Sequence, residues 1–223
     1  MNRPAACFGP RISRAVFFLL LFTANTAFAG NLDFDKTFNA DGEKPQIHYR
    51  ARYVLNGRQH QVEVWRDRDL HLRRRADEDV ETFVFKPAKE TEWQMVILDL
   101  KRKIRTDVAR TNLYRLGNFA DWFGLAHSLA RPVGPYQLLT IAAPRASEKP
   151  LASCRWYALV RSGVESRICW STALRLPMLI TDAQGQVQWR ITGVDSNPLP
   201  AATFEIGDQG FVRNDANEDI RGD

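Results

Sequence analysis

Apolar and polar residues alternate along the chain from Gln46, and the alternation predicts a β-hairpin over residues 46–65. Asn56-Gly57, a strong signal for a two-residue hairpin turn, separates the two alternating segments. A turn there places Arg50 directly opposite Glu63, a favourable cross-strand pair, and gives both strands one apolar face. The residues of that face are Ile47, Tyr49, Ala51, Tyr53, Leu55, Val62 and Val64. The two strands thus agree on which face is apolar, which is typical of a half-buried antiparallel pair.

Further short strand signals follow at regular intervals. They cover residues 70–75, 81–86, 93–100, 136–142, 154–160, 166–172, 177–181 and 187–194. Spacing this short favours an antiparallel meander over βαβ units. We therefore predict a mainly β (α+β) fold with one curved antiparallel sheet over residues 46–195.

One segment follows helical rather than strand spacing. Its apolar positions recur every three or four residues, at Leu113, Leu116, Ala120, Phe123 and His127. Asn118 is the expected N-cap, Asp121 falls in the first turn, and Pro132 ends the segment. We predict a helix over residues 118–130 whose wide apolar arc packs on the sheet.

The two ends of the chain differ from its middle. Three arginines precede an apolar run over residues 15–22, and Ala27-Phe28-Ala29 follows it, which is the pattern of a secretory signal peptide. The run is too short to span a bilayer, so we expect cleavage after Ala29 and a periplasmic or secreted protein with no transmembrane segment. Residues 30–45 are expected to form a flexible leader, and residues 196–223 an acidic, largely irregular tail.

Composition and charge narrow the class of protein. A chain of 223 residues that is 44% hydrophobic and 26% charged excludes wholesale disorder, collagen and coiled coil. The formal net charge of +5 favours a nucleic-acid partner at first sight. Loss of Arg3, Arg11 and Arg14 with the signal peptide reduces this charge to +2. Export also removes most nucleic-acid partners, so we expect none.

Cys154 and Cys169 are the cysteines that remain after cleavage. A four-residue loop at 160–163 would pair Leu159 with Val164 and place the two cysteines directly opposite each other, within disulfide range. Export supplies oxidising conditions, and no C-x-x-C motif points to a redox-active pair. We predict a structural disulfide between them.

No motif points to catalysis or to a metal. G-x-S-x-G is absent, and the hairpin register places His48 and His60 on opposite faces. His127 is expected to pack against Phe123. The run from Asp215 to Asp219 resembles the start of a calcium loop, but Ile220 stands where that loop requires glycine. We expect no enzyme activity, no cofactor and no metal site, and a solvated acidic tail.

Aromatic residues are numerous and open two interpretations. They form either a buried core or a concave apolar face, partly closed by the helix, that receives an acyl chain or a hydrophobic segment of a partner. The candidate ligand-binding residues are Tyr49, Tyr53, Trp93, Trp122, Phe123, Leu125, Trp156 and Trp189.

A second candidate site is the arginine-rich stretch from Arg66 to Arg75. Its candidate partner-binding residues are Arg66, Arg68, Arg73, Arg74 and Arg75. Strand alternation sends Arg74 to one face and Arg73 and Arg75 to the other. The stretch forms either a solvated sheet face or a contact surface for an acidic protein or an anionic lipid surface.

The hairpin from Leu176 to Trp189 resembles a motif of the periplasmic half-barrel group that includes LolA, LolB and RseB/MucB. There, a strand with Leu-Pro, here Leu176-Pro177, leads into a D-x-x-G turn, here Asp182 to Gly185. The order of signal peptide, meander, helical insertion and late hairpin is also similar over residues 46–194. The resemblance implies a half-barrel that wraps one or two helices. No lipobox for a LolB-like anchor is present, and no functional residue is carried over.

These patterns lead to two functional expectations. The first is an exported binding protein that holds a hydrophobic ligand, a lipid or a lipidated partner on the concave face of its sheet. The alternative is a non-catalytic protein-interaction, assembly or stress-sensing module of the cell envelope that uses the Arg66–Arg75 region. A cavity lined by apolar side chains favours binding, whereas converging His or acidic side chains would favour an enzyme.

Overall fold

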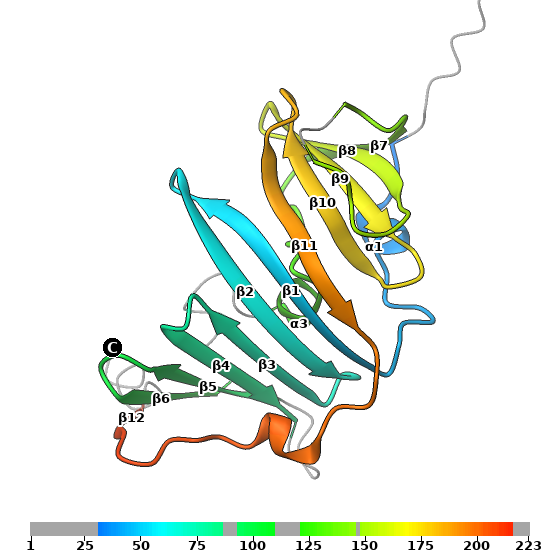
Figure 1. Cartoon of the computed structure of the whole chain (residues 1–223). Helices are drawn as coiled ribbons and strands as arrows, with labels where there is room; N and C mark the ends of the chain where they lie inside the picture. Colours follow the sequence, from blue (N-terminus) through cyan, green and yellow to red (C-terminus); the bar gives the residue numbers. More distant parts are fainter. Residues whose placement is uncertain (1–30, 87–92, 110–120, 146–147, 216–223) are drawn as a thin grey trace, which may run out of the picture.

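The structure is a computed structural model that describes residues 31–86, 93–109, 121–145 and 148–215. One strongly curved sheet of twelve strands dominates it, with two short α-helices packed against one face (Figure 1). The predicted fold class, a mainly β half-barrel that wraps one or two helices, is confirmed.

The sheet has the strand order β12-β6-β5-β4-β3-β2-β1-β11-β10-β9-β8-β7. Neighbouring strands are antiparallel, apart from the parallel pair β12 and β6. The strands are β1 (Gln46–Leu55), β2 (Arg58–Asp67), β3 (His71–Ala76), β4 (Val80–Phe85), β5 (Gln94–Asp99), β6 (Ile104–Ala109), β7 (Tyr136–Ile141), β8 (Arg155–Arg161), β9 (Val164–Ser171), β10 (Leu176–Asp182), β11 (Val187–Asp195) and β12 (Val212–Asp215). The helices within the described residues are α1 (Phe34–Thr37), α3 (Trp122–His127) and the 3-10 helix η2 (Ala201–Phe204). The sequence patterns did not predict β6 and β12.

The β1–β2 hairpin has the predicted register throughout. Leu55 pairs with Arg58, and Arg50 lies opposite Glu63. The turn residues Asn56 and Gly57 both have positive φ, which a tight two-residue hairpin turn requires and which these two residue types adopt readily. The Glu63 carboxylate also lies 2.7 Å from Nε2 of His48.

The β8–β9 hairpin corrects a predicted register. Arg161 pairs with Val164, so the turn has two residues instead of the predicted four. Cys169 therefore faces Trp156, and Cys154 lies just before β8. A disulfide still joins the two cysteines, whose Cα atoms are 5.3 Å apart. The predicted bond is present although the strand register that was used to argue for it is wrong.

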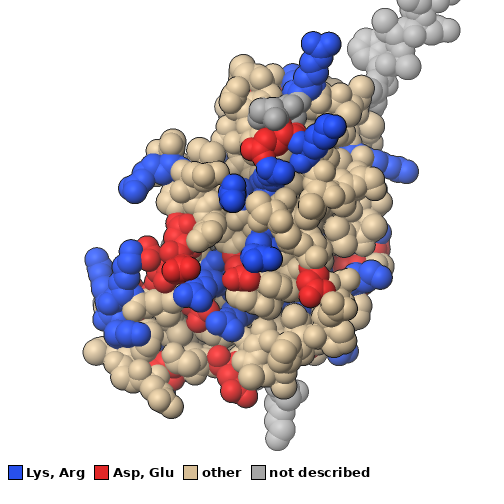
Figure 2. Space-filling view, viewed as in Figure 1, with Lys and Arg blue, Asp and Glu red and all other residues tan. Residues whose placement is uncertain are grey.

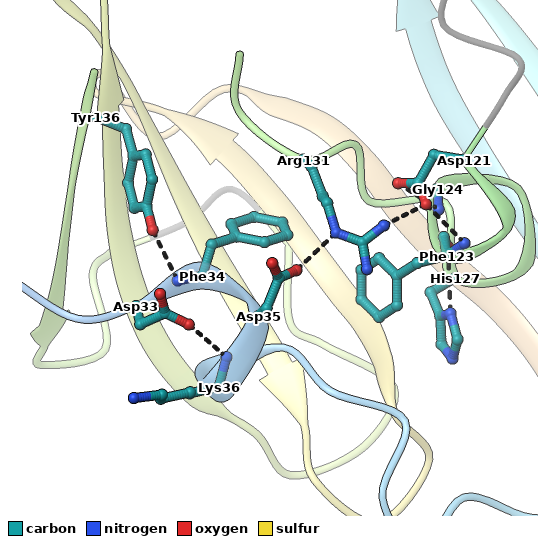
Figure 3. Close-up of polar contacts among 10 residues, drawn as sticks. All are labelled: Asp33, Phe34, Asp35, Lys36, Asp121, Phe123, Gly124, His127, Arg131 and Tyr136. Atoms are coloured by element: carbon teal, nitrogen blue, oxygen red, sulfur yellow. Dashed lines mark hydrogen bonds and ion pairs between the residues drawn. The ribbon is translucent and has the colours of Figure 1, made fainter. Parts of the chain in front are cut away.

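The segment before β1 is not the flexible leader that was predicted. Phe34 and Phe38 are buried in one apolar cluster with Trp170. The Asp33 carboxylate caps α1 by accepting a hydrogen bond from the backbone N–H of Lys36. Arg131 joins this segment to the next helix, as Figure 3 shows. The aromatic residues near the N-terminal end thus belong to the core.

Helix α3 confirms a helix in the predicted region but changes its cap. The Asp121 carboxylate accepts hydrogen bonds from the N–H groups of Phe123 and Gly124, so Asp121 rather than Asn118 is the N-cap (Figure 3). The residues over which the helix was expected to begin lie outside those that the structure describes. His127 stacks on Phe123 as predicted, with ring centroids 4.4 Å apart.

The tail after β11 is more ordered than predicted. It passes along the sheet as η2, and its end adds β12 in parallel to β6 (Figure 1). Ile206 and Phe211 pack on a buried cluster of Phe83, Val96 and Leu98. Arg105 fixes the tail through Nη1, which donates to the Asp208 carboxylate at 2.6 Å. The first part of the tail is therefore a second covering layer of the sheet.

Candidate functional site

Most of the aromatic residues that were predicted to bind a ligand form the core under α3. Six of the eight are buried, namely Tyr49, Trp93, Phe123, Leu125, Trp156 and Trp189, while Tyr53 and Trp122 are partly buried. The Tyr49 hydroxyl donates to the carbonyl of Ala126 at 3.2 Å. The buried side chains therefore belong to the core and do not line an open concave site.

Strand register also separates Trp156 from the others. The pairs Tyr53–Trp189, Trp189–Ile180, Ile180–Ile168 and Ile168–Tyr157 place these five residues on one face. Because side chains alternate along a strand, Trp156 points to the opposite face, where it lies across from Cys169. The eight predicted residues cannot form a single site.

Arg66 belongs to a buried polar cluster and not to a partner-binding surface. Its side chain is fully buried, and Nη1 lies 2.9 Å from Glu43 Oε2 and 2.7 Å from His127 Nε2. Nε2 of His127 also lies 2.8 Å from the same carboxylate oxygen, and Nδ1 lies 3.2 Å from the carbonyl of Phe123. Burial lowers the pKa of His127, although its contact with Glu43 opposes this shift. The cluster ties β2 to α3.

The other predicted arginines are divided between structural roles and different faces. Arg73 forms two hydrogen bonds with Glu81, at 2.9 and 2.6 Å, and a third with the carbonyl of Thr203 at 3.1 Å. Arg68 is 63% exposed and contacts Asp67. Arg74 pairs with Val64 and lies on the face that carries the apolar core. The basic surface predicted over Arg66–Arg75 is therefore not present as one surface.

Arg75 lies in a polar groove with two arginines from β1. Arg50 and Arg52 line this groove of about 460 Å³ together with Arg75, and acidic side chains alternate with them. Figure 2 shows the same mixture of charge, with blue and red side chains interspersed over the surface. The groove has no excess of either charge in its lining.

A largely apolar pocket lies between the β3–β4 hairpin and the tail. Its volume is about 570 Å³. The lining residues are Asp67, His71, Leu72, Phe83, Val84, Phe85, Ala201, Phe204, Glu205 and Ile206. Phe83 and Phe85 come from β4, and η2 supplies the opposite wall with Phe204. None of the eight predicted ligand-binding residues lines this pocket.

The sequence contained a signal for this pocket in β4. Phe83 and Val84 are adjacent and therefore point to opposite faces, yet both are buried. A strand that is apolar on both faces needs a covering layer on each side. Here α3 and its neighbours cover one face, and residues 201–211 cover the other.

The described residues contain no group of three or more His, Cys, Asp or Glu side chains that could hold a metal ion. In the same part of the chain, no helix is both long and apolar enough to cross a membrane.

No family model and no curated protein matches the chain. Its fold is similar to solved structures of MucB. A crystal structure of MucB gives a TM-score of 0.40 at 16% identity and covers 77% of this chain and 61% of that chain. MucB in complex with MucA(peri) gives a TM-score of 0.36 at 18% identity and covers 73% of this chain and 54% of that chain. The Pseudomonas aeruginosa MucA/MucB complex gives a TM-score of 0.35 at 18% identity and covers 73% of this chain and 56% of that chain. The chain thus spans at most 61% of the length of these structures, and the likeness is one of general architecture.

Proposed function

We propose that this protein is an exported, non-catalytic binding protein that holds a hydrophobic group in the pocket between the β3–β4 hairpin and η2. The pocket itself is the observation that carries the proposal. Its volume of about 570 Å³ lies within the range of about 300–1,000 Å³ that is common for small-ligand sites. Its lining is mainly aromatic and aliphatic, as such sites usually are.

Contacts within the chain hold the walls of the pocket in place. Phe83 and Val84 are buried and fixed in the sheet. The opposite wall is joined to β3 by the hydrogen bond from Arg73 to the Thr203 carbonyl. A preformed site of this kind loses little conformational entropy on binding, which favours affinity.

Two observations support export. The N-terminal pattern that ends at Ala29 is that of a cleaved signal peptide, and the disulfide between Cys154 and Cys169 suits an oxidising compartment. We therefore place the mature protein in the periplasm or outside the cell. Residues 31–215 would act there as one domain, with the tail as part of its binding pocket.

Titration with N-phenyl-1-naphthylamine, a neutral apolar dye, tests the pocket. We expect saturable binding with increased fluorescence. Ala201→Trp should weaken binding at least tenfold, because Ala201 is exposed and lines the pocket, so the larger side chain fills it. Ala202→Trp is the matched control, since Ala202 is the next exposed residue of η2 and is not part of the lining.

Two results would contradict this function. One is the absence of saturable binding by the folded full-length chain. The other is unchanged affinity in Ala201→Trp together with unchanged affinity in Phe204→Ala, which removes a wall of the pocket. Circular dichroism of each variant shows whether the fold is retained.

A further inference from the structure

The polar residues of the apolar pocket are mostly acidic. Asp67 and Glu205 contribute carboxylates and His71 an imidazole, and no lysine or arginine lines the pocket. The two acids come from different elements, Asp67 from the end of β2 and Glu205 from the residue after η2. The polar side of the pocket is therefore negatively charged at neutral pH.

Nearby positive charges only partly offset these carboxylates. Arg73 directs two donor groups to Glu81 and one to the carbonyl of Thr203. Arg68 contacts Asp67 through Nε at 3.3 Å, but its side chain is 63% exposed and the contact is screened by solvent. The Glu205 carboxylate forms no hydrogen bond or ion pair with the described residues. The guanidinium of Arg73 lies over the Phe83 ring, 5.5 Å from its centroid, and is paired with Glu81. Two carboxylates thus face one solvated guanidinium, that of Arg68, and one guanidinium that is already paired.

From this arrangement we infer that the ligand is a single-chain amphiphile with a positively charged head group, such as an alkylammonium. This inference rests on the proposed function of the pocket. The apolar chain packs against Phe83, Phe85 and Ile206, and the head group lies beside Glu205. An anionic head group at the same place would meet a carboxylate of like charge and lose affinity.

The aromatic wall of the pocket favours the same ligand. Phe204 is partly exposed, and its ring lies against His71 with centroids 5.4 Å apart. A cation that enters between Phe204 and Glu205 can contact a ring face as well as a carboxylate. Both contacts stabilise a positive charge, and neither stabilises a negative one.

Three ligands with the same ten-carbon chain test the inference. Decyltrimethylammonium, decanol and decanoate displace the neutral dye from the full-length protein at pH 7.5 and low salt, below their micelle concentrations. We expect the cation to bind about tenfold more tightly than decanoate, which corresponds to about 1.4 kcal/mol, with decanol between them. The difference should decrease as salt is added, because the pocket carboxylates are accessible to ions.

Substitutions assign the preference to the two acids. Glu205→Gln combined with Asp67→Asn should bring the three affinities to within about twofold of one another and leave decanol unchanged. Glu78→Gln is the matched control, because Glu78 is an exposed acid in the turn at the other end of the β3–β4 hairpin. It should keep the wild-type order of affinities.

The outcomes separate this inference from the function on which it rests. If decanoate binds as tightly as the cation, or if the double variant keeps the cation preference, the charge selectivity is wrong and the pocket function stands. If neither the dye nor any of the three ligands binds, the pocket function itself is wrong.

Discussion

The two faces of the sheet are built from the same strands but are covered in different ways. On the face that carries α1 and α3, aromatic side chains pack against the helices, and the face is filled. On the other face, the tail crosses β3 to β6 and buries Phe83, Val96 and Leu98, but it leaves Phe85 beside them only partly buried. The pocket lies where this second cover leaves space.

This comparison shows that an aromatic-rich sheet face does not by itself indicate a binding site. Tyr49 and Trp189 were candidate ligand contacts because they are large and apolar, and those same properties make them good partners for a helix. A site arises where the covering segment is too short or too polar to fill the surface. The tail fits that description, since it supplies a single turn of 3-10 helix and otherwise irregular chain over this surface.

The largest expected effect contrasts one aromatic residue from each face. Phe123→Ala, on the filled face, should lower the free energy of unfolding by about 3–5 kcal/mol, because the buried ring leaves a cavity between α3 and α1. Phe204→Ala, in the pocket wall, should lower it by about 1 kcal/mol or less, because that ring is already partly exposed. Urea denaturation measures both values.

Similar losses in the two variants would remove the contrast between the faces. Phe123→Leu serves as a control for the size of the cavity, and it should lose less stability than Phe123→Ala because it leaves a smaller void. An unchanged denaturant slope in each variant keeps the comparison valid.

Much of the sheet could be predicted from the sequence because its signals are local. Asn56-Gly57 and the alternation on both sides of it determine the β1–β2 register residue by residue. The β8–β9 register was missed because Ser162 adopts a positive φ beside Gly163, so a tighter turn forms than expected. Local pattern alone does not distinguish a two-residue from a four-residue loop at that point.

The pocket could not be predicted, because it depends on contacts between distant segments. Phe204 meets His71 across more than a hundred residues of sequence, and the polar composition of the tail indicated irregular chain. Likewise, Arg66 looked like a surface residue, but it is buried, and it contacts Glu43 and His127 from two separate segments. Such partners become visible only when the strand order is known.

Removal of the disulfide gives the second-largest expected effect. It should lower the stability of the protein without changing the pocket in the other half of the sheet. The bond closes a short loop with a sequence separation of 15, for which chain entropy gives about 3 kcal/mol. Reduction, or Cys154→Ser with Cys169→Ala, should therefore lower the free energy of unfolding by about that amount. Dye binding at 20 °C should not change, because β8 and β9 lie far from the pocket in the strand order.

Loss of dye affinity on reduction of the still-folded protein would show that the two halves of the sheet are coupled. Treatment of the double variant with the same reductant is the control. It should cause no further change in stability or binding.

The smallest expected effect concerns how firmly the tail covers its face. The hydrogen bond from Arg105 lowers the pKa of the Asp208 carboxyl below its usual value near 3.9. Because the folded-state pKa is lowered, Asp208 stabilises the docked tail above about pH 4, and this stabilisation is lost as the pH falls through the lower folded-state value. NMR signals of β12 should therefore lose their native shifts on acidification before those of β1 and β2.

Asp208→Asn should weaken the pairing of β12 with β6 already at pH 7, whereas Glu165→Gln, in β9, should not. Loss of β12 and β1 signals at the same pH would mean that the tail is as much a part of the cooperative fold as α3.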